Sequence, residues 1–431
     1  MKKYIFFVVG VMCTLLSHTA YAIDLNKSDA NIIGHVLEKK TGEHLPYMTV
    51  ALKGTTIGTM TDGTGHYFLK NLPEGEFILS VSAVGYKPQE RKVTLKRGKT
   101  LEENFELEED MVALDGVVVT ANRNETARRL APTLVKVVTP KLFDMTNSHT
   151  LSQGLVFQPG VRVENDCQNC GYSQVRINGM DGKYTQILID SRPIFSALAG
   201  VYGLEQIPAN MIERVEVVRG GGSALFGSSA IAGTVNIITK EPLRNSGSFA
   251  HSISNFDGSG SFDNNTTLNL SLVSSDNKMG AYIYGQNRHR SAWDSNGDSF
   301  SELPKLKNQT VGVNAYYRLS PYSKLNLEYH HMEEFRRGGN RFDLPPHIAE
   351  DANLNGSGEP GLVEQIEHSI NTGGLKFSAF SKDQKHAFNA YASAQHIVRD
   401  SYYSAYGHTT DFTGVLGAQS VSYTHLTLPT T

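Results

Sequence analysis

The chain has 431 residues, a net charge of −3, 40 glycines, 19 phenylalanines and 19 tyrosines. It has no basic excess, which argues against a nucleic-acid partner, because binding a phosphate backbone requires clustered positive charge. The length predicts two or three domains. After the N-terminus no stretch reaches the roughly 18 consecutive apolar residues of a transmembrane helix, so we expect any membrane to be crossed by strands.

Residues 1–22 are predicted to be a secretory signal peptide. Two lysines precede an apolar run over residues 5–16, and a small-x-small cleavage site, Ala-Tyr-Ala, ends at Ala22. The apolar run is too short for a stable transmembrane helix. We therefore expect the mature protein to be exported.

Residues 30–108 are predicted to form a small β-sandwich, because short strand-like runs alternate with turn clusters. The segment GTMTDGTGHYFLKNLPEGEFILSVSAVGYKP is similar to the carboxypeptidase-regulatory-like domain at the front of many Bacteroidetes-type outer-membrane receptors. His35 and Glu38 have an HxxE spacing, but on a strand their side chains point to opposite faces. We therefore expect His35 to be an ordinary surface histidine rather than a metal ligand.

Residues 114–126 contain LDGVVVTA after an acidic stretch. Consecutive valines favour an extended chain, which can pair with another protein's sheet edge through main-chain hydrogen bonds. One more strand of the sandwich is the alternative. The string resembles the TonB box of TonB-dependent receptors, which implies that periplasmic TonB binds here and that the following polar residues are a tether. The implied contact residues are Asp115, Val117, Val118, Val119 and Thr120.

Residues 127–240 end in IERVEVVRGGGSALFGSSAIAGTVNIITK. Glycines after a strand suggest a phosphate site, but the third glycine of a dinucleotide fingerprint and the GK[ST] of a P-loop are missing. The segment instead resembles the end of the plug domain of TonB-dependent outer-membrane receptors. The matching residues are Arg176, Gly179, Asp190, Glu213, Arg214, Glu216, Arg219, Gly220, Ser223, Gly227, Gly233 and Asn236.

Two further expectations concern a turn and a charged strand of this plug domain. Ser191 stands where the family usually has glycine, so the turn there departs from the family pattern. The charged residues of the strand over 212–219 are expected to be enclosed by a polar barrel lumen and to pair with one another or with the barrel wall. Arg219 is included in this expectation.

Two cysteines remain after signal removal, Cys167 and Cys170. Export to an oxidising compartment favours a disulfide between them. A reduced pair and a metal contact are the alternatives, although no second cysteine pair supports a zinc site.

Residues 241–419 show repeated two-residue alternation of apolar and polar side chains, with short turns and long polar loops. This pattern is typical of transmembrane β-barrels. We expect about eight strands, whereas plugged transporters have 22, so the segment is predicted to be the first part of a truncated barrel. Residues 420–431 are predicted to be a foreign tail.

The loop WDSNGDSFSE offers oxygen ligands at spacings like those of a calcium loop. It lacks the central glycine and the bidentate last ligand of that motif. A solvated polar loop is the alternative to calcium binding. The candidate ligands are Asp294, Asn296, Asp298 and Glu302.

The expected fold is mainly β: an N-terminal β-sandwich, a mixed α/β plug and an incomplete antiparallel transmembrane β-barrel. The resemblance implies a receptor in the cell outer membrane that imports a scarce nutrient and is not an enzyme. The plug end differs from that of glycan receptors, which favours a chelated metal (ferric siderophore, cobalamin or haem). A glycan importer of the same family and a non-transporting surface-binding barrel are the alternatives. Expected partners are TonB, the chelate, outer-membrane lipid and a surface lipoprotein, with structural calcium as the only cofactor considered.

Overall fold

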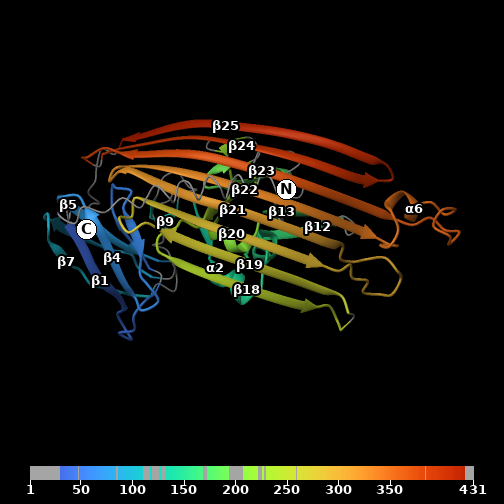
Figure 1. Cartoon of the computed structure of the whole chain (residues 1–431), viewed down its shortest axis with the longest axis horizontal. Helices are drawn as coiled ribbons and strands as arrows, with labels where there is room; N and C mark the ends of the chain where they lie inside the picture. The colour runs from blue at the N-terminus through green and yellow to red at the C-terminus, as the bar shows by residue number, and fades with distance from the viewer. Residues whose placement is uncertain are drawn as a thin grey trace.

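A computed structural model shows a protein built almost entirely of β-strands. The described residues are 30–46, 48–83, 86–109, 117–118, 126–127, 133–167, 172–193, 207–221, 226–227, 230–258, 260–383 and 385–422. Figure 1 shows the N-terminal strands, in blue, at one end of a long sheet of yellow to red strands. The expected signal peptide lies outside the described residues. Among these residues, no helix is both long and apolar enough to cross a membrane.

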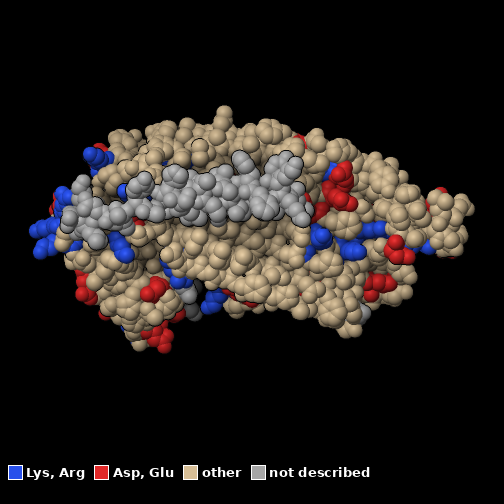
Figure 2. All heavy atoms as spheres, viewed as in Figure 1, with Lys and Arg blue, Asp and Glu red and all other residues tan. Residues whose placement is uncertain are grey.

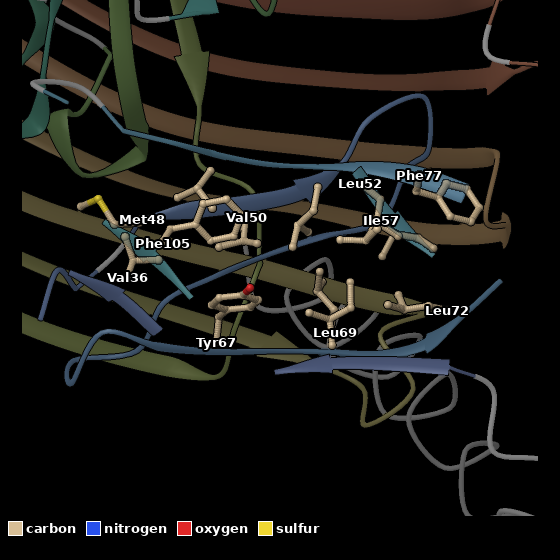
Figure 3. Packing of buried hydrophobic residues seen from close by; sticks show 14 of the residues in the cluster. Val36, Met48, Val50, Leu52, Ile57, Tyr67, Leu69, Leu72, Phe77 and Phe105 are labelled. Atoms are coloured by element: carbon tan, nitrogen blue, oxygen red, sulfur yellow. The ribbon is translucent and has the colours of Figure 1, made fainter. Parts of the chain in front are cut away.

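The N-terminal unit is a sandwich of two four-stranded sheets. One sheet has the order β4-β1-β7, with β8 also paired to β1, and the other has the order β3-β2-β5-β6. Apolar side chains from both sheets meet in one core (Figure 3), in which Val50, Leu69 and Leu79 are fully buried. The strands are β1 (Ala30–Glu38), β2 (Thr49–Leu52), β3 (Gly58–Met60), β4 (His66–Leu72), β5 (Gly75–Ser82), β6 (Gln89–Leu95), β7 (Thr100–Glu102) and β8 (Phe105–Leu107).

The middle unit, called the plug below, is a five-stranded sheet of order β11-β16-β17-β14-β15 beside a hairpin, β12–β13. Strand β17 pairs antiparallel with β16 and parallel with β14, so β17 lies at the centre of the sheet. The elements are β11 (Val135–Val138), α2 (Pro140–Met145), α3 (Leu151–Leu155), β12 (Val161–Cys167), β13 (Tyr172–Ile177), η2 (Gly182–Tyr184), β14 (Thr185–Ile189), β15 (Arg192–Pro193), η3 (Ala209–Met211), β16 (Ile212–Arg219) and β17 (Gly233–Thr239).

The C-terminal unit, called the barrel sheet below, is one antiparallel sheet whose eight strands are neighbours in chain order. Its outer strands, β18 and β25, are not paired with each other in the described residues, so the sheet is open. The strands are β18 (Ser246–Asn255), β19 (Phe262–Val273), β20 (Met279–Arg290), β21 (Lys305–Ser320), β22 (Ser323–Gly339), β23 (Val363–Phe380), β24 (His386–Tyr403) and β25 (Tyr406–Ser422).

The two ends of the barrel sheet differ in their connections. The turns at one end are short, as in residues 274–278 and 321–322. The loops at the other end include residues 291–304 and 340–362, and the second of these carries helix α6 (Pro346–Glu350). Short turns on one side and long loops on the other are typical of an outer-membrane barrel, which confirms the predicted fold class.

Side chains of the barrel sheet have the reverse of the polarity of a soluble protein. On one face leucines are exposed, including Leu268, Leu270 and Leu272 of β19. On the other face polar and charged side chains are buried; they include Asp263, Asn265, Gln286, Arg288, Asn308, Glu334 and Arg336. In Figure 2 the charged side chains that the view shows lie mainly near the two ends of the molecule. This is the arrangement of a sheet that presents its apolar face to lipid.

Strand β25 continues past the expected barrel boundary at residue 419. Ser420 and Val421 pair with Phe388 and Ala387 of β24, and the strand ends at Ser422. Small polar and apolar residues continue to alternate through this segment, so the pairing of β25 with β24 also continues. The remaining residues of the expected tail, 423–431, lie outside the described residues.

Candidate functional site

Strand β16 brings charged side chains into the plug. The Arg214 Nε donates to Glu216 Oε1 at 2.9 Å, and Glu216 is fully buried. Glu213 is half-buried, whereas Arg219 is exposed and lies beside Gly160. Arg219 is thus exposed in this structure, whereas the sequence analysis expected it to be enclosed.

Two consecutive residues with a left-handed backbone form the turn after β14. Asp190 has φ 46° and Ser191 has φ 65°. The Asp190 carboxylate accepts hydrogen bonds from the N–H of Thr239 at 3.0 Å and from its hydroxyl at 2.7 Å. Asn236 accepts from the Ser191 N–H at 2.9 Å and donates to the Ser191 hydroxyl at 3.2 Å. These bonds hold a serine in a conformation that favours glycine, which gives Asp190 and Asn236 a structural role.

The predicted signature glycines occupy positions that restrict a side chain. Gly179, Gly220 and Gly227 have φ of 75°, 100° and 99°. At Gly233 a Cβ atom would lie only 2.3 Å from a backbone carbonyl oxygen of β16, so only glycine allows this strand pairing. Ser223 lies outside the described residues.

Arg176 of the signature links the hairpin β12–β13 internally. Its guanidinium forms an ion pair with Glu164 on the opposite strand, and its Nη2 lies 3.6 Å from Asp181. Arg176 therefore fixes the hairpin to the turn that follows β13.

The plug contacts the barrel sheet through polar groups. The Arg192 guanidinium forms an ion pair with Glu328 of β22, and the side chains are only 9% and 25% exposed. The Asn210 Nδ2 donates to Asn269 Oδ1 at 2.9 Å, and the Asn210 carbonyl accepts from the Tyr282 hydroxyl at 2.9 Å. None of these contacts can be predicted from the sequence, because the partners are far apart in the chain and carry no local motif.

His149 is a second contact between the plug and the sheet. Its Nε2 lies 3.2 Å from the Ser252 hydroxyl, and its carbonyl accepts from Gln286 Nε2 at 3.4 Å. Burial is the main cause that lowers the pKa of His149 to about 4, and the nearby Arg288 guanidinium adds to it. His149 is therefore neutral near pH 7.

A cavity lies between the plug and the polar face of the barrel sheet. The plug side contributes Arg192 and Lys240, and burial lowers the pKa of Lys240. The sheet side contributes Tyr284, Glu328 and His330. A pocket with aromatic walls and a few charged groups can hold an organic ligand.

The expected TonB box is described only in part. Val117–Val118 form strand β9, which pairs antiparallel with β10 (Thr126–Ala127). Asp115, Val119 and Thr120 lie outside the described residues. The described part of the box is thus an extended segment that already pairs with the chain just after it.

The expected disulfide lies outside the described residues, which include neither Cys170 nor the side chain of Cys167.

In the loop after β20, ligand oxygens of Asp294, Asp298 and Glu302 lie within 4.8 Å of one another. The Asn296 Oδ1 accepts from the Asp298 N–H at 3.0 Å, and the Asp294 carboxylate accepts from loop N–H groups. These contacts are those of a polar turn, and calcium binding here stays a prediction.

Two family models match the chain. Residues 32–119 match the CarboxypepD_reg-like domain, and residues 127–234 match the TonB-dependent receptor plug domain. The second range contains most of the signature described above. The chain thus contains the plug domain of the TonB-dependent receptors, the family that it resembles. Receptors of that family are outer-membrane β-barrel proteins, and the exposed apolar face of the barrel sheet has the polarity of such a barrel.

Known TonB-dependent receptors resemble the chain over part of their length. The vitamin B12 transporter BtuB of Vibrio vulnificus (strain YJ016) is 32% identical over 229 residues, which are 46% of this chain and 37% of the transporter. BtuB of Photobacterium profundum is 37% identical over 128 residues, covering 29% of this chain and 20% of the relative. This chain thus aligns with less than half the length of these curated relatives.

Solved structures show the same fold. The siderophore receptor PirA from Acinetobacter baumannii matches with a TM-score of 0.54 and 20% identity over 67% of this chain and 44% of PirA. A mutant of the ferric enterobactin receptor PfeA from Pseudomonas aeruginosa matches with a TM-score of 0.52 and 18% identity over 68% of this chain and 46% of PfeA. At these identities the likeness establishes the architecture alone.

Proposed function

We propose that this receptor imports a scarce chelated metal across the outer membrane, driven by TonB. The observation that carries the proposal is the polar contact between the plug and the barrel sheet, centred on Arg192 and Glu328. Water can solvate such polar groups once they have separated, so the plug can leave this position when TonB pulls on it. The similar proteins named for vitamin B12 and siderophores support a metal chelate as the ligand.

The cavity beside this contact supports the same ligand class. It combines aromatic and apolar walls with charged groups, among them Arg192 and Lys240. Catecholate chelates are partly aromatic, so they suit the aromatic and apolar walls better than a sugar does. Arg192 is already paired with Glu328 and does not by itself select an anion. A glycan importer remains the competing proposal, because the front domain occurs in both kinds of receptor.

Uptake by cells that express a full-length version of the receptor tests the ligand class. We expect ferric siderophore, cobalamin or haem to accumulate, and accumulation to stop when TonB is deleted. An oligosaccharide of similar mass is the control ligand. TonB-dependent uptake of the oligosaccharide, with none of the three chelates, would overturn the proposal in favour of a glycan importer.

Coupling to TonB is tested at the box. Val118→Pro removes one backbone donor and bends the strand, so we expect uptake to be lost while the ligand still binds. Val118→Ala is the matched control, because it keeps the backbone N–H and should retain uptake. Normal uptake by the proline variant would place the TonB-binding segment elsewhere in the chain.

A further inference from the structure

Three histidines form a cluster on the outer surface of the front domain. The ring centroids of His35 and His44 are 5.3 Å apart, those of His35 and His66 are 5.8 Å apart, and those of His44 and His66 are 4.9 Å apart. His44 and His66 are exposed and His35 is half-buried, so solvent reaches the cluster. The proposed transport function uses none of these residues.

The fold brings the three rings together from separate parts of the sequence. His35 of β1 and His66 of β4 are direct register partners, so their side chains emerge on the same face of the sheet. His44 forms an isolated bridge with Leu37, which places it on that face as well. Gly65, with φ 75°, allows the approach, because a Cβ atom there would lie 2.8 Å from the Cβ of His44.

The ring separations match those around a tetrahedral metal ion. Metal–nitrogen bonds of about 2.0–2.1 Å put each imidazole centroid roughly 3.2 Å from the ion, so two centroids at the tetrahedral angle are about 5.2 Å apart. The three observed separations, 4.9, 5.3 and 5.8 Å, lie around this value. The ring nitrogens do not converge on one point in this structure, so binding requires the rings to rotate about their side-chain bonds.

Hydrogen bonds already orient one of the rings. The Thr64 hydroxyl lies 2.7 Å from Asp62 Oδ1 and 3.1 Å from His66 Nδ1. An ionised carboxylate can only accept, so the hydroxyl donates to Asp62 and accepts from the Nδ1–H of His66. The lone pair of a neutral His66 is then on Nε2. A hydrogen bond to the other ring nitrogen, here made by the Thr64 hydroxyl, also fixes the tautomer of metal-binding histidines.

We propose that His35, His44 and His66 bind one divalent transition-metal ion of the kind that prefers imidazole nitrogen, such as Zn²⁺. Three nitrogens leave a fourth tetrahedral position for water or an incoming ligand. The front domain contacts the short-turn end of the barrel sheet, where the Thr56 N–H donates to the Pro321 carbonyl at 2.9 Å. The site therefore draws its ion from the compartment on that side of the membrane.

The site is tested by titrating the full chain in detergent with zinc and measuring the heat of binding by calorimetry. Excess calcium is present throughout, so that the acidic loop of Asp294 does not contribute. We expect one zinc ion per chain, and each of the variants His35→Gln, His44→Gln and His66→Gln to weaken binding at least about tenfold. His251→Gln, an exposed histidine of β18, is the matched control and should bind as the parent does.

A second measurement reports the ligands directly. Co²⁺ in place of zinc should give the strong visible absorption of a tetrahedral site, and each of the three variants should lose it while keeping the parent's circular dichroism. Absence of zinc binding in the parent would overturn the proposal. So would unchanged binding in the three variants, or loss in only one of them, because a single surface histidine would then account for the ion.

Discussion

The front domain and the barrel sheet are built from the same alternating strands but have opposite polarity. In β4 of the front domain, Leu69 is buried and His66 is exposed. In β19 of the barrel sheet, Leu270 is exposed and Asp263 is buried. Period-two alternation therefore determines that a segment is a strand, and only its surroundings determine which face is apolar. Water surrounds the first unit, and we expect lipid on one side of the second and the plug on the other.

The largest effect is expected from a buried ion pair on the inner face of the sheet. Arg288 donates to Asp263 through Nε at 3.0 Å and through Nη2 at 2.5 Å. Asp263→Ala would leave a buried guanidinium without its carboxylate, which costs about 3–5 kcal/mol. The free energy of unfolding in urea and lipid measures this. Lys278→Ala is the control, because its pair with Asp276 is exposed and should matter by less than about 1 kcal/mol. Equal effects would mean that the inner face is hydrated like a surface.

The next largest effect is the difference in stability cost between placing arginine at two apolar positions of similar exposure. Leu270 is 37% exposed on the barrel sheet and Ile33 is 39% exposed on the front domain. In lipid, Leu270→Arg should cost about 2–4 kcal/mol, because it puts a charge into the hydrocarbon region. Ile33→Arg should cost less than about 1 kcal/mol, because that side chain faces water. The same unfolding measurement compares them, and equal costs would show that the exposed leucines do not face lipid.

The smallest expected effect is a loss of stability when the pH is lowered, caused by the buried His149. An unfolded histidine has a pKa of about 6.5, whereas burial lowers the pKa of His149 to about 4. Between these pH values the histidine is protonated in the unfolded chain but not in the folded chain. The free energy of unfolding therefore falls as the pH drops from about 6.5 towards 4. Because His149 is partly exposed, the loss should be about 1–2 kcal/mol. Comparing unfolding of His149→Gln with that of the parent across this range isolates it. If the free energy of unfolding of the variant depends on pH as strongly as that of the parent, the pH dependence comes from other groups.

Local pattern predicted the fold well and the contacts within it poorly. Alternation over residues 241–419 was sufficient to predict about eight strands, which the structure places between Ser246 and Ser422. The glycine-rich end of the plug carried its own signature. Arg192 and Glu328 are 136 residues apart, and His149 and Ser252 are 103 apart. Such pairs depend on how separate sheets pack, which no local spacing encodes. The sequence predicted His35 to be an ordinary surface histidine for the same reason, since only the register between β1 and β4 brings it to His66.

The central claim is that the barrel sheet presents one face to lipid and the other to the plug. Spin labels placed singly at residues 266–272 of β19, in lipid bilayers and in a chain whose natural cysteines are serine, test it most directly. Labels at positions 268, 270 and 272 should collide preferentially with oxygen dissolved in the bilayer, and labels at the alternating positions should not. Accessibility without a period of two, or with the opposite phase, would contradict the account.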